Sequence, residues 1–208
     1  MLLVLGLGFS GWAVARQAQA AGHAVAGTAR DPAALAAAAR ALAIPFAAAA
    51  EAIGRATRLL ITAPPGEAGD PVLATHGPAL EAALTAGTLR WVGYISTTGV
   101  YGDRNGAEVD EDTPPAPGQP RSHRRLAAER AWCEAIAGRA PLDLMRAGGI
   151  YGPGRSVLDD LRAGTARRVL KPGHVFARVH RAVTALGPLS ALAQIRQMKN
   201  RDIRTIEQ

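Results

Sequence analysis

The stretch Leu2-Leu3-Val4-Leu5-Gly6-Leu7-Gly8-Phe9-Ser10-Gly11 decides the fold. Residues 2–5 form an uninterrupted apolar run, which is typical of a short strand that is buried on both faces. Residues 6–11 have the spacing G-x-G-x-x-G, and residues 11–21 have helical composition. A strand, a glycine-rich turn and a helix in this order predict the first βα unit of a dinucleotide-binding domain.

Each glycine of this turn has a predicted role. Gly6 allows the tight turn, Gly8 lets the backbone approach a pyrophosphate, and Gly11 lets the helix pack close to the strand. The N–H groups at the start of the helix, which include those of Phe9 and Ser10, attract phosphate together with the helix dipole. The alternative is a glycine-rich turn that binds no ligand.

Short apolar strands alternate with longer helices along the rest of the chain. The expected strands are 24–28, 44–46, 58–63, 91–95 and 142–145, and the expected helices are 33–42, 71–86, 122–137 and 157–163. A Gly77-Pro78 pair interrupts the second of these helices. The alternation predicts an α/β fold, a doubly wound parallel sheet with right-handed crossovers and helices on both faces.

Composition places the chain among globular proteins. Its 208 residues are 48% hydrophobic and 20% charged, which is too apolar for general disorder. No run approaches the roughly 18 apolar residues that a membrane span needs. The single cysteine, Cys133, excludes an internal disulfide. With no export signal in the opening residues, we expect a cytoplasmic protein.

The charge is divided unevenly between the two parts of the chain. Residues 1–119 have a net charge of −3, and residues 120–208 have a net charge of +10. We interpret the basic part as an arginine-rich solvated face, because no aromatic stacking platform accompanies the arginines. The expected partner is therefore a small-molecule substrate, with no nucleic acid and no membrane. No cluster of His, Cys, Asp and Glu has metal-ligand spacing, so no metal site is predicted.

The end of the second strand bears on the choice of cofactor. An acidic residue there would accept the ribose 2′-hydroxyl of NAD. This chain has the neutral Thr28 followed by Arg30, whose guanidinium can pair with a 2′-phosphate. We therefore expect NADP, with NAD as the alternative, and Ala63 and Pro64 as further cofactor contacts. Arg30 could instead point to solvent.

Two later segments resemble one known family. Residues 94–103, Y-I-S-T-T-G-V-Y-G-D, resemble the S-S-x-x-V-Y-G stretch of extended short-chain dehydrogenases/reductases. Residues 146–155, R-A-G-G-I-Y-G-P-G-R, resemble the R-x-x-x-[VI]-Y-G-P-G segment of the same proteins. With the glycine-rich turn, the chain resembles an atypical member of the NAD-dependent epimerase/dehydratase family over about residues 1–180.

The resemblance implies a division of the chain. Residues 1–155 would form an NAD(P)-binding Rossmann domain, and residues 156–208 an incomplete small C-terminal lobe with a divergent basic tail. That tail is either a truncation or a genuine short variant. A half-built lobe would expose apolar surface, so we expect self-association into a homo-oligomer.

The resemblance also assigns catalytic positions. Thr97, four residues before Tyr101, takes the place of the hydroxyl that hydrogen-bonds the substrate oxygen, unless it only satisfies a local turn. The family's catalytic Tyr-x-x-x-Lys pair falls on Arg121 and Arg125. Arg cannot exchange a proton at neutral pH, so Arg121 cannot replace the tyrosine, whereas Arg125 can still hold a ribose or phosphate. Tyr101 and His123 are the substitute proton donors.

Two residues after the last strand complete the predicted site. Tyr151 and Arg155 are expected at the substrate mouth, where Arg155 would hold an anionic group. The predicted function is NADP(H)-dependent oxidoreduction or epimerisation of a small carbonyl or sugar-like substrate. The missing Tyr-Lys pair leaves a second hypothesis, a non-catalytic NADP-binding sensor or degenerate family member.

Overall fold

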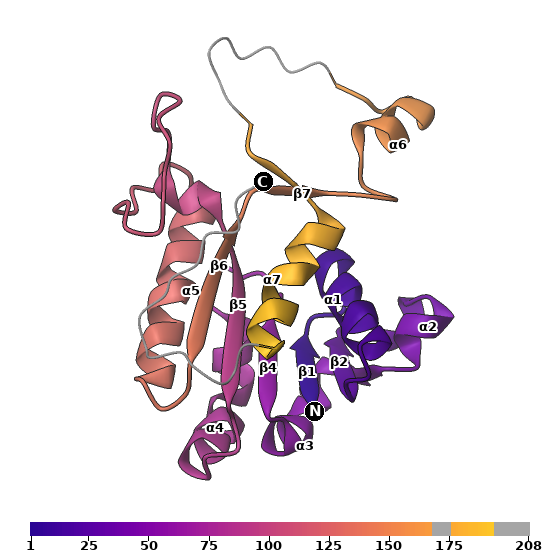
Figure 1. The fold of residues 1–208 in the computed structure, drawn as a ribbon, viewed down its shortest axis with the longest axis vertical. Helices are drawn as coiled ribbons and strands as arrows, with labels where there is room; N and C mark the ends of the chain where they lie inside the picture. The colour runs from indigo at the N-terminus through magenta and orange to yellow at the C-terminus, as the bar shows by residue number, and fades with distance from the viewer. Residues whose placement is uncertain (168–175, 194–208) are drawn as a thin grey trace.

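The computed structural model describes residues 1–167 and 176–193. Its main sheet is parallel, with six strands in the order β3-β2-β1-β4-β5-β6 (Figure 1). The strands are β1 (Leu2–Leu5), β2 (Val25–Ala29), β3 (Ala43–Pro45), β4 (Arg58–Ile61), β5 (Trp91–Thr97) and β6 (Leu142–Ala147). The strand order reverses between β1 and β4, so the carboxyl edge there is the switch point where ligands of such sheets bind. The predicted doubly wound α/β fold is confirmed.

Helices cover both faces of the sheet (Figure 1). The α-helices are α1 (Phe9–Ala20), α2 (Ala37–Arg40), α3 (Ala49–Arg55), α4 (Pro71–Thr85), α5 (Pro120–Ile136), α6 (Val157–Arg162) and α7 (Arg181–Ala193). The 3₁₀ helices are η1 (Pro32–Ala34), η2 (Phe46–Ala48) and η3 (Thr98–Tyr101). The buried apolar residues of α3, α4 and α5 pack on one face, and those of α1 and α7 pack on the other.

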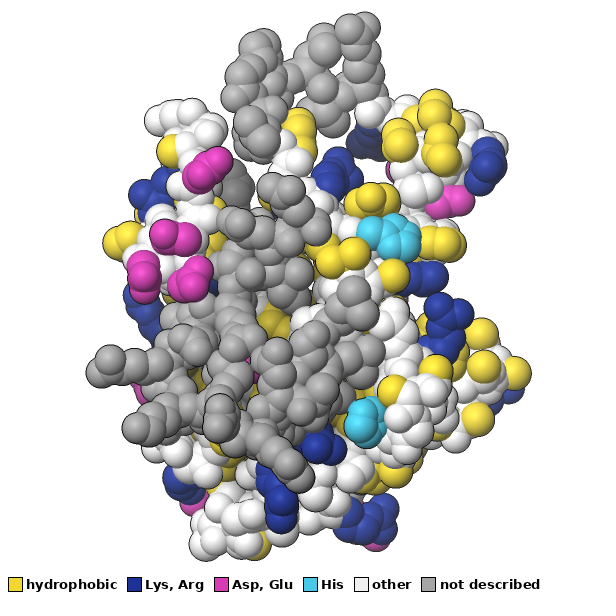
Figure 2. Space-filling view, viewed as in Figure 1, with side chains coloured by type: hydrophobic (Ala, Val, Ile, Leu, Met, Phe, Trp, Pro, Cys, Tyr) yellow, Lys and Arg dark blue, Asp and Glu magenta, His cyan; other side chains and the backbone are white. Residues whose placement is uncertain are grey.

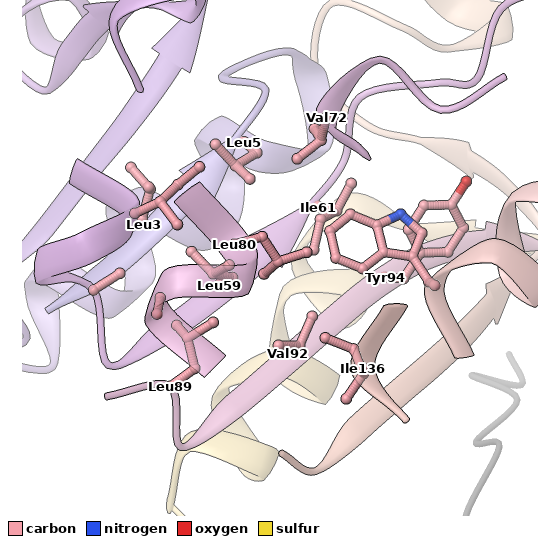
Figure 3. Close-up of a cluster of buried hydrophobic side chains, with 14 of the residues drawn as sticks. Leu3, Leu5, Leu59, Ile61, Val72, Leu80, Leu89, Val92, Tyr94 and Ile136 are labelled. Carbon is pink, nitrogen blue, oxygen red and sulfur yellow. The ribbon is translucent and has the colours of Figure 1, made fainter. Parts of the chain in front are cut away.

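The core lies in two layers because alternate strand residues point to opposite faces. Leu3 and Leu5 pack toward α3, α4 and α5, whereas Leu2 and Val4 pack toward α1. Figure 3 shows the first layer, in which strand residues meet Leu80 of α4 and Ile136 of α5. Full burial of each such side chain contributes about 1.5–3 kcal/mol. The strands are therefore a rigid platform for the loops at their carboxyl ends.

The prediction of a single alanine-rich helix over residues 33–42 is wrong. The segment forms η1 and then α2, separated by Leu35, which is extended with ψ 150. In α2 only Ala39 is buried. Alanine propensity alone does not sustain a continuous helix without an apolar face that packs against the sheet. The short helix α3, which has such a face in Ala52 and Ile53, was not predicted from the sequence.

A bend in α4 occurs at the expected Gly77-Pro78 interruption. Pro78 has no N–H and its ring clashes with the preceding turn, so the helix cannot continue undistorted. His76 leaves helical geometry, with φ −120 and ψ 15. The His76 ring nitrogen Nε2 lies 2.8 Å from the Phe46 carbonyl oxygen, which fixes the bend against η2.

A small second sheet lies beyond the main one. It pairs β7 (Gly149–Tyr151) with β8 (Arg178–His180) in parallel. The predicted helix after Ser156 is present as α6, which stands away from the main sheet (Figure 1). The chain then returns, and α7 packs against α1. The basic end of the tail, residues 194–208, lies outside the described residues, and the domain boundary at 155/156 stays a prediction.

Candidate functional site

The glycine-rich turn connects β1 to α1 at the switch point of the sheet. Gly6 has φ +120, and a Cβ there would lie 2.7 Å from the Thr62 hydroxyl oxygen. A Cβ at Gly11 would lie 2.0 Å from the Gly6 carbonyl oxygen, so α1 could not pack this close to the strand with any other residue. The Thr62 hydroxyl donates to that same Gly6 oxygen over 2.5 Å. Thr62, which sequence reasoning missed, therefore holds the turn closed from the end of β4.

Gly8, in contrast to Gly6 and Gly11, has open space at its Cβ position. It is exposed, and a Cβ there would meet no atom of the described residues within 4 Å. The backbone N–H groups of Phe9 and Ser10 begin α1 and have no hydrogen-bond partner among the described residues. Open space above a helix start with free N–H donors fits the diphosphate of a dinucleotide. Ala63 and Pro64 adjoin the turn, because the Ala63 N–H donates to the Leu5 carbonyl next to Gly6.

The end of β2 presents Arg30 to solvent. Arg30 is exposed and has no ion pair or hydrogen bond among the described residues, so its guanidinium is available to a ligand. Asp31 acts as a helix cap, since its Oδ1 accepts from the Ala33 N–H over 3.0 Å. Thr28 is fully buried, and its hydroxyl has no hydrogen-bond partner in the described part of the chain.

A pocket of about 250 Å³ opens beside the turn. It lies at the carboxyl ends of the strands and is lined by Ser10, Thr62, Ile95, Ser96, Thr97, Arg125, Ala147, Gly148, Ile150 and Arg155. The lining combines hydroxyl groups, apolar side chains and two arginines. The lining contains no His, Cys, Tyr, Lys, Asp or Glu side chain.

Thr97 lies at the end of β5, where its side chain enters the pocket wall. Its Oγ1 accepts a hydrogen bond from the Gly99 N–H over 3.2 Å, which caps η3. The local turn therefore uses the oxygen as an acceptor. The hydroxyl proton is still available to donate, because a threonine hydroxyl is both a donor and an acceptor.

Tyr101 lies behind the pocket wall. Its side chain is 1% exposed, and the Arg146 guanidinium carbon lies 4.8 Å from its ring centroid. Arg146 in turn forms a buried ion pair with Glu129, with Nη2 2.8 Å from Oε2. The Ser96 hydroxyl donates to the other oxygen of Glu129. Sequence reasoning missed Ser96, Glu129 and Arg146 as a group.

Arg125 reaches the pocket from the first turns of α5. Its Nη1 donates to the Tyr94 hydroxyl over 3.0 Å and to the Ile95 carbonyl over 3.1 Å, so the guanidinium is fixed against β5. Burial raises the pKa of Tyr94 to about 12, although the nearby Arg125 opposes that shift. Tyr94 therefore is not a proton donor of the kind that the missing tyrosine would supply. Arg121 and His123 are both exposed and lie outside the pocket lining.

The two predicted substrate residues differ in position. Arg155 lines the pocket, and its guanidinium carbon lies 4.4 Å from the Phe9 ring centroid. Tyr151 is 40% exposed and meets the His180 ring edge-on, with 5.3 Å between centroids. The structure therefore brings together Ser10, Thr97, Arg125 and Arg155 and leaves Tyr151 outside their pocket.

Residues 1–167 and 176–193 contain no group of three His, Cys, Asp or Glu side chains that could hold a metal ion. Within the same ranges, every helix is too short or too polar to cross a membrane.

Known proteins share this fold. No family model and no curated protein matches the sequence. A functionally unknown conserved protein from Silicibacter pomeroyi DSS is 37% identical, with a TM-score of 0.83 over 93% of this chain and 68% of that one. The UDP-glucuronic acid 4-epimerase from Bacillus cereus, solved with UDP-glucuronic acid and NAD, is 17% identical, with a TM-score of 0.71 over 99% and 77% of the two chains.

The human epimerase family protein SDR39U1, solved with NADPH, is also similar. It is 17% identical, with a TM-score of 0.68 over 98% of this chain and 74% of that one. These neighbours show the fold, and the Silicibacter pomeroyi protein shows the family. The chain therefore belongs to the family of that conserved protein and shares the fold of the UDP-glucuronic acid 4-epimerase and of SDR39U1.

Proposed function

We propose that the chain binds NADP(H) and serves hydride transfer to or from a small carbonyl or sugar-like substrate. The observation that carries the proposal is the glycine-rich turn, which is closed at Gly6 and Gly11 and open at Gly8. The turn leads directly to the pocket through Ser10. Two structural neighbours were solved with NAD or NADPH at this fold, which supports the cofactor class.

The choice of NADP rests on Arg30. An exposed guanidinium without a partner among the described residues, next to the end of β2, can donate two charge-assisted hydrogen bonds to the 2′-phosphate. Asp31, the next residue, caps η1 by accepting from the Ala33 N–H through its Oδ1. NAD remains the alternative cofactor.

The pocket residues have separate proposed roles in binding the substrate and the cofactor. The bound cofactor would supply or take the hydride. Thr97 donates its hydroxyl proton in a hydrogen bond to the substrate oxygen, and Arg125 places a fixed positive charge near the ribose. Ile95, Ala147 and Ile150 supply the apolar part of the wall. A pocket of about 250 Å³ suits a small carbonyl compound or part of a sugar.

The lack of a proton donor in the described pocket lining favours a second candidate function. The pocket lining contains no His, Cys, Tyr, Lys, Asp or Glu side chain, and Tyr101 is buried and outside that lining. A positioned acid contributes typically 10²–10⁴-fold to such reactions. A protein that binds NADP without turning substrate over, as a sensor of its redox state, is therefore the alternative.

Turnover on a panel of small aldehydes and ketones, followed by NADPH absorbance, separates these candidates. We expect very slow or undetectable turnover from the wild-type chain. The double variant Arg121→Tyr with Arg125→Lys restores the family's Tyr-x-x-x-Lys pair in the sequence. Because Arg121 is exposed and outside the pocket lining, the variant should raise the rate only if the substrate lobe is adequate and brings position 121 to the substrate. Ordinary enzymatic rates in the wild type would show that another acid acts, and Tyr101→Phe and His123→Ala would then identify it.

A further inference from the structure

Two arginines converge on the aromatic ring in the glycine-rich turn. The guanidinium carbon of Arg155 lies 4.4 Å from the Phe9 ring centroid, and that of Arg181 lies 4.6 Å from it. Arg155 comes from the turn after β7, which Gly152 and Arg155 close with backbone hydrogen bonds of 2.8 and 3.0 Å. Arg181 is the first residue of α7, immediately after β8. Segments far apart in the sequence thus meet above Phe9.

These two charges have no counter-charge among the residues that the structure describes. Neither side chain has an ion pair or a hydrogen bond among the described residues. Both guanidinium carbons are within 4.6 Å of one centroid, so they lie at most about 9 Å apart. That separation is within a Debye length at physiological salt, so the two like charges repel each other. An anion between them would turn this repulsion into attraction.

The position of Phe9 indicates which anion. Phe9 lies between the open Gly8 and Ser10, at the start of α1, and its own N–H is unpaired in the described structure. Arg155 shares the pocket wall with Ser10. The arginines therefore contact the side chain of a residue whose own N–H is free, at the start of α1. Planar guanidinium groups bind phosphate bidentately and stack on aromatic rings, and an aromatic platform orders them before binding.

We propose that Arg155 and Arg181, stacked on Phe9, form an anion clamp that closes over the diphosphate of the bound dinucleotide. Arg155 and Arg181 would hold the diphosphate together with the free N–H groups of the glycine-rich turn. This inference rests on the proposed NADP(H) site and adds two binding residues to it. It also gives the β7–β8 sheet and the start of α7 a direct part in cofactor binding.

Calorimetric titration with NADPH and with adenosine diphosphate tests the clamp in the full chain. Arg155→Ala and Arg181→Ala should each weaken both ligands about tenfold or more, and the double variant should weaken them further. Arg178→Ala is the matched control, because Arg178 lies on β8 over the Phe176 ring, 5.9 Å from its centroid, and is exposed. That variant should bind like the wild type. Thermal unfolding without ligand checks that each variant folds.

The outcomes separate the clamp from the cofactor site itself. If the wild type binds NADPH and the double variant binds it equally well, the clamp is overturned while the cofactor site stands. The clamp on the cofactor is also overturned if the double variant keeps its affinity for NADPH but its NADPH complex no longer binds a nucleoside diphosphate sugar. The two arginines would then bind the diphosphate of the substrate. If the wild type does not bind NADPH, the proposed function fails. A titration with inorganic pyrophosphate then tests the clamp by itself. Pyrophosphate binding to the wild type that is lost in the double variant supports an anion clamp. No pyrophosphate binding to the wild type overturns the clamp.

Discussion

At the residue scale, Gly11 and Gly8 of the glycine-rich turn differ in how much space each leaves for a side chain. A methyl group at Gly11 would lie 2.0 Å from the Gly6 carbonyl oxygen, so the backbone would have to shift. A methyl group at Gly8 would meet nothing within 4 Å in the described structure. Gly11 therefore serves the packing of α1 on β1, and Gly8 leaves open the space that we propose for the ligand. The G-x-G-x-x-G spacing alone cannot separate these two tasks, whereas the atoms around each Cβ do.

Gly11→Ala should lower the free energy of unfolding, because it forces two backbone segments apart. Overpacking of this kind costs about 1–3 kcal/mol. Urea denaturation of the variant and the wild type measures the difference. Gly54→Ala in α3 is the control, because a Cβ there meets no atom within 4 Å and alanine favours the helix by roughly 0.5–1 kcal/mol. Equal stability of Gly11→Ala and the wild type would contradict the close packing of α1.

Arg30→Ala should weaken NADPH binding by about 1.5–3 kcal/mol, the contribution of a hydrogen bond to a charged group. NADH has no 2′-phosphate, so its affinity should barely change. Parallel calorimetric titrations of the two cofactors measure the effect. Equal losses of affinity for NADPH and NADH would show that Arg30 does not bind the 2′-phosphate.

A buried ion pair joins distant segments at the element scale. Glu129 of α5 is 2% exposed and Arg146 of β6 is 3% exposed, and Ser96 of β5 donates to the same carboxylate. The pair therefore anchors α5, which carries Arg125, to the strands whose ends line the pocket. Because Arg146 stacks on Tyr101, it also fixes η3.

Glu129→Ala should destabilise the fold strongly, because it leaves the Arg146 charge buried without a partner. Breaking such a pair costs about 3–5 kcal/mol. Replacing both residues, as Glu129→Gln with Arg146→Met, should recover much of that loss. Denaturant unfolding of the wild type, the single variant and the double variant measures these differences. A single variant within experimental error of the wild type would mean that the pair does not tie α5 to β6.

Local patterns explain what could be predicted at this scale. The apolar run Leu2–Leu5 and the six-residue turn after it contain all the information for the first βα unit, and the structure has that unit as expected. The Ser96–Glu129 hydrogen bond spans 33 residues, and no local period encodes it. Thr62 could have been noticed, since it is a hydroxyl residue directly after the buried run of β4. Arg181 could not, because its neighbour Phe9 lies at the other end of the chain.

Apolar surface gathers over α6 at the scale of the whole molecule. Val157, Leu158 and Leu161 are 65%, 58% and 60% exposed. Figure 2 shows these hydrophobic side chains together at the upper right of the molecule, over α6. Single exposed apolar residues are ordinary, but a contiguous group on one short helix favours association.

The wild-type chain should therefore self-associate as its concentration rises. Replacing the apolar face, as Leu158→Glu with Leu161→Lys, should shift the protein to a smaller species without changing its fold. Sedimentation velocity over a range of concentrations measures the association, and circular dichroism checks the fold. If the wild type and the variant sediment alike at every concentration, α6 does not mediate association.

The central claim is that the turn from Gly6 to Gly11 holds a dinucleotide, and calorimetric titration of NADPH into the wild type and Gly8→Val tests it most directly. A valine side chain at Gly8 enters the space that the diphosphate needs but meets no protein atom within 4 Å of its Cβ. The wild type should bind NADPH, and ligand should raise its unfolding temperature. Gly8→Val should unfold at the same temperature as the wild type without ligand and show no binding. Unchanged NADPH affinity in the folded variant would contradict the account.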